Sequence, residues 1–398
     1  MGANQNVTML SLRIQKVFFF AIILFLSFSC RKKGCMDPNA TNFDSDAEVA
    51  DNTTCLYVDF ERSEMLANIC DNYIIPAYAD FNEKTTILNV AATTFSSDPT
   101  DTKFQLLKDA WKIALLSWQQ VSFIDFGPAE FIILKNQVNI YPTNVSLISE
   151  NISLGVYDLG NSSNNDAKGF QALDYLLHMP GLNEQEQVAY FIGEDNALTY
   201  LVELTNDLKN NAQYVVNEWE VYKSTFRSNN GSNAVGSSVS NLVNGLCSYY
   251  ETYIRKGKIG LPLGAFNQFT QEIDPTLVEC YYHQESLPFI STALEGMKKY
   301  INGVSFNGNM NGLGLDDYMD YVGATQNSSS LSTVISDQID LVLGSLGELN
   351  DPLSNELAVN ESGVLDTYGT MQQLVPYMKV DMTSALGVLI TYQDNDGD

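Results

Sequence analysis

The spacing of apolar residues after residue 61 is the feature that most restricts how this chain can fold. Between Thr102 and Phe126 the apolar side chains recur every three or four positions and form one stripe: Phe104, Leu107, Ala110, Trp111, Ala114, Leu115, Trp118, Val121 and Ile124. Similar spacing predicts helices over residues 61–79, 168–177, 184–226, 240–256, 278–302, 314–322, 330–346 and 363–386. No succession of segments alternates with a period of two, so the sequence predicts an all-α fold.

One polar segment divides the helical sequence into two parts. Residues 228–237 are rich in Ser, Asn and Gly, which interrupt helical spacing and are typical of a linker. We therefore expect an N-terminal helical bundle at residues 61–227 and a C-terminal helical bundle at residues 238–398. A second polar stretch, residues 136–166, is predicted as an irregular excursion of the kind that often carries function.

The N-terminus predicts export. Residues 1–29 contain no acidic residue, and Arg13 and Lys16 precede an apolar run that is too short to span a bilayer comfortably. The small residues before Cys30 are similar to a bacterial lipobox, so we expect a signal peptide at 1–29 and a lipid on Cys30. That lipid would anchor the protein to the outer or cytoplasmic membrane, on the periplasmic side or at the cell surface. An uncleaved signal anchor is the alternative.

The cysteines that follow agree with an oxidising compartment. Cys35 and Cys55 bracket a polar segment within residues 30–60, and we expect them to form a disulfide that ties this spacer together. Its Asp and Asn residues could supply oxygens to calcium, but their spacing is not that of an EF-hand. Cys70, Cys247 and Cys280 each lie in an apolar, helix-like context, so at least one is expected to be a buried thiol. A Cys247–Cys280 pair stays open.

The charge of the chain excludes one class of partner. The formal net charge is −27 at pH 7, and loss of the signal peptide would remove only basic residues. Such a surface repels nucleic acid and anionic lipid headgroups, whereas it tolerates or attracts cations. We therefore expect no nucleic-acid partner.

Four segments, in order along the chain, resemble the imelysin family. They are residues 110–128, residues 168–177, residues 254–264 and the tail from 374 to 398. The resemblance implies an all-helical fold of two bundle domains with a cleft between them. It also implies a cell-envelope location and an association with iron or haem uptake. The family is named for a peptidase, although proteolysis is not its general activity.

The family motif Gly-x-His-x-x-Glu is altered in this chain. In that motif His and Glu lie one turn apart on a helix face and can share a metal ion. Here Gln171 stands in place of the His and Asp174 in place of the Glu. A neutral amide is a poor ligand for zinc or iron. His178 lies four residues after Asp174, so a displaced carboxylate–imidazole pair is one reading, and a histidine that caps the helix end is the other.

Other candidate residues come from the second half of the chain. Arg255 and Lys258 concentrate positive charge in a glycine-rich stretch, which predicts either an anion-binding site facing the cleft or a structural turn with salt bridges. The resemblance places Asp381 and Ser384 near the same cleft. His283 is expected on the flank of a helix.

These observations lead to one main functional hypothesis. We expect a non-enzymatic envelope lipoprotein that binds a metal ion, a metal chelate or another small ligand in support of iron uptake, with a divalent metal or iron as its cofactor and envelope iron-uptake proteins as partners. The alternatives are a divergent metallopeptidase and a structural lipoprotein whose site has decayed. The sequence contains no His-Glu-x-x-His motif, and we assign no catalytic residue.

Overall fold

The computed structural model describes residues 31–37, 40, 42–55, 59–266 and 272–393. The signal peptide at 1–29 and the lipid on Cys30 lie outside the described residues and stay predictions. The chain separates into two compact units, Met1–Phe60 and Glu61–Asp398, each of which is described by itself. Within the described part of the chain, no helix is both long enough and apolar enough to cross a membrane.

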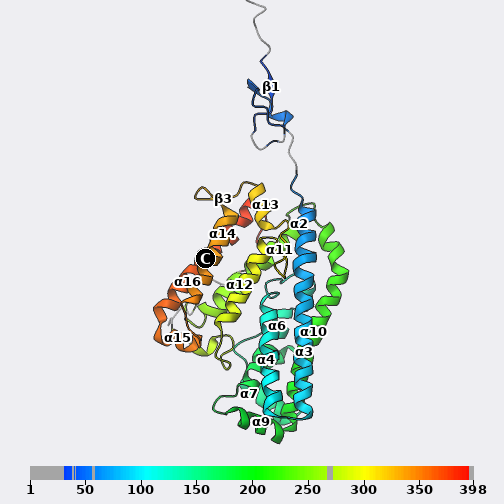
Figure 1. The fold of residues 1–398 in the computed structure, drawn as a ribbon, viewed down its shortest axis with the longest axis vertical. Helices are drawn as coiled ribbons and strands as arrows, with labels where there is room; N and C mark the ends of the chain where they lie inside the picture. The colour runs from blue at the N-terminus through cyan, green and yellow to red at the C-terminus, as the bar shows by residue number, and fades with distance from the viewer. Residues whose placement is uncertain (1–30, 38–39, 41, 56–58, 267–271, 394–398) are drawn as a thin grey trace, which may run out of the picture. The chain divides into compact units, whose positions relative to one another are not determined.

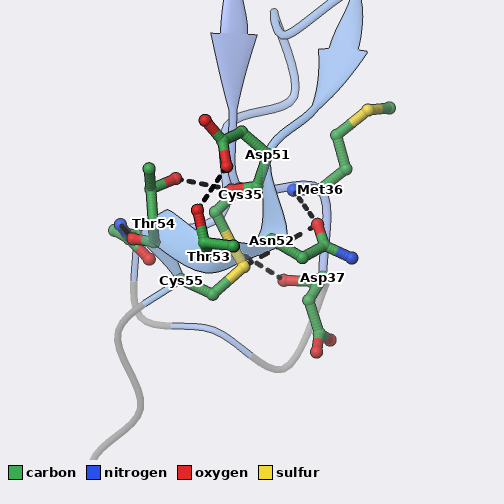
Figure 2. The surroundings of a disulfide bond; sticks show 9 residues. Cys35, Met36, Asp37, Asp51, Asn52, Thr53, Thr54 and Cys55 are labelled. Atoms are coloured by element: carbon green, nitrogen blue, oxygen red, sulfur yellow. Dashed lines mark hydrogen bonds between the residues drawn. A yellow bond between two sulfur atoms is a disulfide. The ribbon is translucent and has the colours of Figure 1, made fainter.

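The first unit is a small disulfide-tied module (Figure 2). Two short parallel strands, β1 (Lys33–Gly34) and β2 (Val49–Ala50), pair beside the 3-10 helix η1 (Asn52–Thr54). The expected Cys35–Cys55 disulfide is confirmed, with Cα atoms 4.9 Å apart and 20 residues of separation. Closing a loop of that length stabilises a module with little core of its own by about 3 kcal/mol.

Three long helices, which we call the helical centre, pack side by side in the second unit (Figure 1). The segments α2 (Arg62–Asn68), the π-helical η2 (Ile69–Ile74) and α3 (Ile75–Ser97) follow one another, and α3 packs between α4 (Asp101–Gln119) and α10 (Asp195–Ser228). The nine stripe residues predicted within 102–126 are all buried, which confirms the periodicity argument. The helix itself ends at Gln119, and the last stripe residues pack from the turn that follows.

Short helices surround this centre. They are α5 (Pro128–Phe131), α6 (Leu134–Val138), α7 (Val145–Leu154), η3 (Ser162–Ala167), α8 (Gly169–Leu177) and α9 (Glu184–Gly193). The prediction of an irregular stretch at 136–166 was therefore wrong in part. Asn144 and Asn161, which suggested a loop, accept backbone N–H bonds at the starts of α7 and η3, because Asn favours helix N-termini as well as turns.

The remaining elements form the second half of the unit. They are α11 (Ser238–Tyr249), the π-helical η4 (Tyr250–Gly260), η5 (Pro275–Leu277), α12 (Leu287–Ile301), α13 (Leu315–Tyr321), the hairpin β3 (Thr325–Gln326) and β4 (Ser329–Ser330), α14 (Leu331–Gly347), α15 (Leu353–Val359), α16 (Glu361–Pro376), η6 (Tyr377–Met382) and α17 (Thr383–Leu386). The all-α fold is confirmed. Below, "first half" means residues 61–227 and "second half" means residues 238–393.

The predicted linker is held against the second half. The segment between α10 and α11 is held by Asn233, whose amide donates to the Tyr318 hydroxyl at 2.7 Å and to the Leu386 carbonyl at 2.6 Å. Residues 61–398 group as one unit, and the division into separate bundle domains at 228–237 stays a prediction.

The helix predicted over 278–302 begins only at Leu287. Pro288 falls in its first turn, where a proline is tolerated because those N–H groups have no partner within the helix. The preceding stretch, residues 278–286, is a non-helical turn in which Cys280 and Gln284 adopt φ angles of 59° and 65°. The expectations of a helical context for Cys280 and a helix flank for His283 were therefore wrong. We call residues 278–286 the site turn.

Candidate functional site

Helix α8 carries the altered motif and is buried along most of its length. It begins at Gly169, whose φ angle is 73°. A Cβ at this position would lie 2.3 Å from the Val138 carbonyl oxygen, so only glycine allows α8 to start this close to α6. The motif glycine thus fixes where α8 begins and which face it turns toward the second half.

Gln171 ties α8 to the site turn. Its Oε1 accepts the backbone N–H of Cys280 at 2.9 Å, and its Nε2 donates to Asn139 Oδ1 at 2.9 Å and to the Cys280 sulfur at 3.6 Å. Both ends of the amide are therefore used within the protein. The Cys280 thiol is free and buried, as are Cys70 and Cys247, so no Cys247–Cys280 disulfide forms.

Asp174 continues the same connection one turn later. Its Oδ2 accepts the N–H of Tyr282 at 3.0 Å, and its Oδ1 accepts the N–H of His283 at 2.8 Å. The carboxylate is 1% exposed, and this burial raises its pKa, although His178 and the two backbone donors act in the opposite direction. Two side chains of the first half therefore hold three backbone N–H groups of the second half.

His178 caps the end of α8 as one reading predicted, and its role in a metal-binding pair with Asp174 stays a prediction. It is the C-cap residue of α8, and its Nδ1 lies 3.1 Å from the Asp174 carbonyl oxygen and 3.1 Å from Asp174 Oδ1. Because both neighbours are acceptors, Nδ1 carries the proton and Nε2 presents a lone pair. That nitrogen lies 3.2 Å from Nδ1 of His283, although the two histidines are 105 residues apart.

The environment of His283 was not foreseen from the sequence. Both imidazole rings pack edge-on against Trp111, with ring centroids 5.2 Å and 5.1 Å away. His283 Nε2 lies 3.7 Å from Glu285 Oε2, and that carboxylate pairs with Lys112. Burial, followed by the neighbouring His178, lowers the pKa of His283 to about 4, so its imidazole is neutral at pH 7.

A buried ion pair is connected to Gln171 through Asn139. Lys258 pairs with Glu279, and the two side chains are 2% and 1% exposed. Gln119 bridges them, donating to Glu279 Oε1 at 3.0 Å and accepting from Lys258 at 3.0 Å, while Asn139 donates to Glu279 Oε1 at 2.8 Å. We call the connected set the polar chain: Gln119, Asn139, Gln171, Asp174, His178, Lys258, Glu279 and His283.

Arg255 lies elsewhere on η4 and is 2% exposed. Its guanidinium donates to the Tyr368 hydroxyl at 3.0 Å, bonds Gln372, and lies 3.8 Å from Glu251. Arg255 and Lys258 are therefore both paired inside the protein, but they lie on the helix η4, so the prediction of a turn at these residues was wrong. Ligand binding by them stays a prediction.

The two C-terminal candidates lie away from the polar chain. Asp381 on η6 accepts the Gln326 amide at 2.7 Å, and Ser384 on α17 is exposed. Neither lines either of the pockets described next. Their expected role in ligand binding also stays a prediction.

Two neighbouring pockets flank the site turn. The first has a volume of about 230 Å³ and is lined by residues of both halves: Tyr141, Pro142, Thr143, Gln171, Asp174, Thr276, Val278, Tyr281 and Tyr282. The second, of about 380 Å³, is lined by Lys108, His178, Met179, Pro180, Gly181, Leu182, Gln187, Tyr281, Tyr282, Gln284 and Ser354. Tyr281 and Tyr282 line both, so the site turn separates them.

The residues at the motif positions do not fit a resident metal ion. The Gln171 oxygen already accepts a backbone N–H, and each Asp174 oxygen accepts one as well. Among the residues that the structure describes, no group of three or more His, Cys, Asp or Glu side chains could hold a metal ion. Gln171 and Asp174 therefore position the site turn and leave one face toward the first pocket.

Comparisons with known proteins agree with this architecture. Iron-regulated protein A of Synechococcus elongatus is 22% identical over 161 residues, a stretch that spans 40% of this chain and only 40% of that protein. The crystal structure of an iron-regulated protein A precursor from Parabacteroides distasonis has a TM-score of 0.67 at 18% identity, covering 82% of this chain and 95% of that one.

A second solved structure shows the same fold. The imelysin-like protein of Psychrobacter arcticum has a TM-score of 0.65 at 16% identity and covers 84% of this chain and 99% of that one. The family model described as imelysin, which carries a peptidase label, matches residues 74–375 and thus most of both halves. With this match across α3 to α16, the chain belongs to the imelysin family.

Proposed function

We propose that this protein is a non-enzymatic binding protein of the cell envelope that holds iron, as a small chelate, in the first pocket. The observation that carries the proposal is the pocket itself, where Asp174 and Gln171 of α8 face side chains from the second half. Ligand sites commonly lie between packed helical layers and combine few polar groups with a preformed cavity.

The polar groups of the pocket wall suit a hydroxylated iron chelate, which supplies the ligands of the metal itself. Asp174 offers a carboxylate, while Tyr141, Thr143, Tyr281 and Tyr282 offer hydroxyl groups.

The names of the relatives and the predicted signal peptide support an iron-related role in the cell envelope. Two of the similar proteins carry the name iron-regulated protein A. The charge pattern before Cys30 predicts export and lipidation. Replacing Cys30 with Ser is expected to move the protein from the membrane fraction to the soluble fraction, measured by fractionation and immunoblotting. A variant that stays with the membrane would contradict the anchor.

A role in proteolysis is less well supported by the geometry. A metallopeptidase needs a metal that keeps an open coordination position and a nearby general base. The oxygen atoms of Gln171 and Asp174 instead accept hydrogen bonds from the site turn. Cleavage of denatured casein that chelators and Asp174→Ala both abolish would overturn the binding proposal in favour of an enzyme.

Binding can be tested by calorimetry with ferrous iron alone, ferric citrate, and citrate alone. Thr276 is exposed at the first pocket, so Thr276→Trp is expected to crowd that pocket without touching the polar chain, and to weaken iron binding at least about tenfold. Ser354 lines only the second pocket, so Ser354→Trp is the matched control and should change affinity less than about twofold.

Three outcomes would overturn the proposal. Iron binding that is equal in both tryptophan variants would remove the first pocket as the site. No binding of either iron form would favour a structural role, and binding of citrate alone with the same affinity would show that iron is not what is recognised.

A further inference from the structure

The two histidines of the chain are arranged in a line between two carboxylates. His178 Nε2 and His283 Nδ1 face each other at 3.2 Å. On the outer side of each ring, Asp174 Oδ1 lies 3.1 Å from His178 Nδ1, and Glu285 Oε2 lies 3.7 Å from His283 Nε2. The sequence contains no other histidine.

This line is one proton short when both rings are neutral. There are three gaps to fill: Asp174 to His178, His178 to His283, and His283 to Glu285. Two neutral imidazoles bring two protons. The first two gaps are at hydrogen-bonding distance, and His283 Nε2 is left buried with no hydrogen-bond partner. A single positive charge placed between the rings would let every nitrogen and both carboxylates be satisfied.

We propose that His178 Nε2 and His283 Nδ1 bind one borderline divalent transition-metal ion, such as Zn²⁺ or Cu²⁺, at a site separate from the first pocket. Two imidazole nitrogens that bind a tetrahedral ion at 2.0–2.1 Å lie about 3.3 Å apart. The observed separation of 3.2 Å is close to this distance, and the two rings would turn so that both lone pairs point at an ion beside the line between the nitrogens. Neutral imidazole is a preferred ligand for both ions.

Binding at this site changes one tautomer and releases no net proton. The ion replaces the proton on Nδ1 of His283, and Nε2 of the same ring takes a proton up and donates it toward Glu285. Each ligating ring then has a carboxylate on its outer nitrogen, which is the outer-shell arrangement that orients metal-binding histidines. Asp174 already makes that contact with His178, whereas Glu285, now 3.7 Å from His283 Nε2, would move closer to make it.

The surrounding residues pack against both rings, and the second pocket reaches His178. Trp111 packs edge-on against both imidazoles, and Lys112 holds Glu285. No third His, Cys, Asp or Glu among the described residues completes a ligand set. The remaining positions would be taken by water or by a ligand from the second pocket, whose wall includes His178 and Lys108.

The test titrates the purified protein with Zn²⁺ alone and with Cu²⁺ alone, by calorimetry and by electron paramagnetic resonance of the copper form. One equivalent is expected, with hyperfine splitting from two imidazole nitrogens. His283→Gln should weaken binding at least about tenfold, and Glu285→Gln, which removes only an outer-shell carboxylate, about tenfold. His178→Gln with His283→Gln leaves no imidazole and measures adventitious binding by the acidic surface.

The proposal fails if one-equivalent binding is absent, if the copper spectrum shows no nitrogen splitting, or if the double variant binds as tightly as the natural protein. The spectrum of the natural protein makes the test independent of how well any variant folds. Thr276→Trp should leave this site unchanged, so failure of iron binding in the first pocket and failure of the two-histidine site are separate outcomes.

Discussion

Trp118 and Lys258 are both almost completely buried, yet different forces hold them. Trp118 packs against Phe81 with ring centroids 5.5 Å apart, and its Nε1 has no hydrogen-bond partner in the structure. Lys258 is held by an ion pair with Glu279 and a hydrogen bond to Gln119. Apolar burial is non-directional and scales with area, whereas the polar chain depends on each partner being present. The helical centre should therefore tolerate exchange of similar side chains, and the polar chain should not.

The largest effect is expected where a buried charge loses its partner. Lys258→Met should lower the free energy of unfolding by about 3–5 kcal/mol, because Glu279 stays buried without its cation. Adding Glu279→Gln should recover most of this loss, since no uncompensated charge remains. Urea-induced unfolding measures both. Lys298, paired with Asp340 at the surface, is the matched control, and Lys298→Met should cost less than about 1 kcal/mol.

These two variants test whether the polar chain differs from the helical centre. A double variant as unstable as Lys258→Met alone would mean that the lysine contributes by packing rather than by pairing. The polar chain would then behave like the helical centre.

A smaller loss is expected when one hydrogen-bonding side chain is removed. Gln171→Leu keeps the size of the side chain but leaves the Cys280 N–H without its acceptor, which should cost about 1–3 kcal/mol. Amide hydrogen exchange at Cys280 should become faster in this variant. Gln105 on the exposed face of α4 is the control, and Gln105→Leu should change stability by no more than about 0.5 kcal/mol. An unchanged exchange rate at Cys280 would mean that the site turn keeps its conformation without the Gln171 contact.

The polar chain should also give the protein a pH dependence that the apolar centre lacks. The pKa of His283 is about 4 in the folded protein and 6.5 without its surroundings. Between these values the unfolded chain binds more protons at this imidazole, so the contribution of His283 to stability should fall as the pH drops from 6.5 toward 4, by on the order of 1–2 kcal/mol at pH 5. Asp174 and Asp316, whose pKa values are raised by burial, act in the opposite direction over this range. Denaturant unfolding from pH 4 to 8 measures this slope.

The contribution of His283 can be isolated by substitution. His283→Gln should flatten the profile between pH 4 and 6.5. Burial acts to raise the pKa of Glu285, but Lys112 and His283 hold it below its ordinary value of 4.5, so its own contribution falls at lower pH. An equal slope with and without the imidazole would assign the pH dependence to other groups.

The smallest effect is expected inside the helical centre. Leu208 on α10 is fully buried, and Leu208→Met conserves its volume and polarity. The free energy of unfolding should fall by less than about 1.5 kcal/mol. Thermal and urea unfolding together measure this. A loss as large as that of Lys258→Met would show that the centre is as strictly specified as the polar chain.

The sequence allowed the helical centre to be predicted and the polar chain only in fragments. The stripe from Phe104 to Ile124 is a local pattern, so its burial follows from spacing alone. Gln171, Asp174 and His178 were picked out because they share one helix. Their partners in the site turn lie more than 100 residues away, and no local spacing connects them.

Some of the errors had a local signal. Pro288 marked the true start of α12, and this would have separated Cys280 and His283 from the helix predicted over 278–302. The pairing of Lys258 with Glu279 had no such signal, because opposite charges 21 residues apart are common in any chain. Long-range polar contacts depend on the folded arrangement, which periodicity does not encode.

The way α8 holds the site turn has a consequence for how this pocket can diversify. Gln171 and Asp174 bind main-chain N–H groups of Cys280, Tyr282 and His283, which every residue except proline possesses. Tyr281 and Tyr282 contribute no side chain to these contacts, so their side chains can be exchanged without loosening the attachment of the turn. Tyr281 and Tyr282 line both pockets, so substitutions at these positions should change the pocket walls while the backbone of the turn stays in place. Libraries randomised at these two positions should yield folded proteins with new ligand preferences.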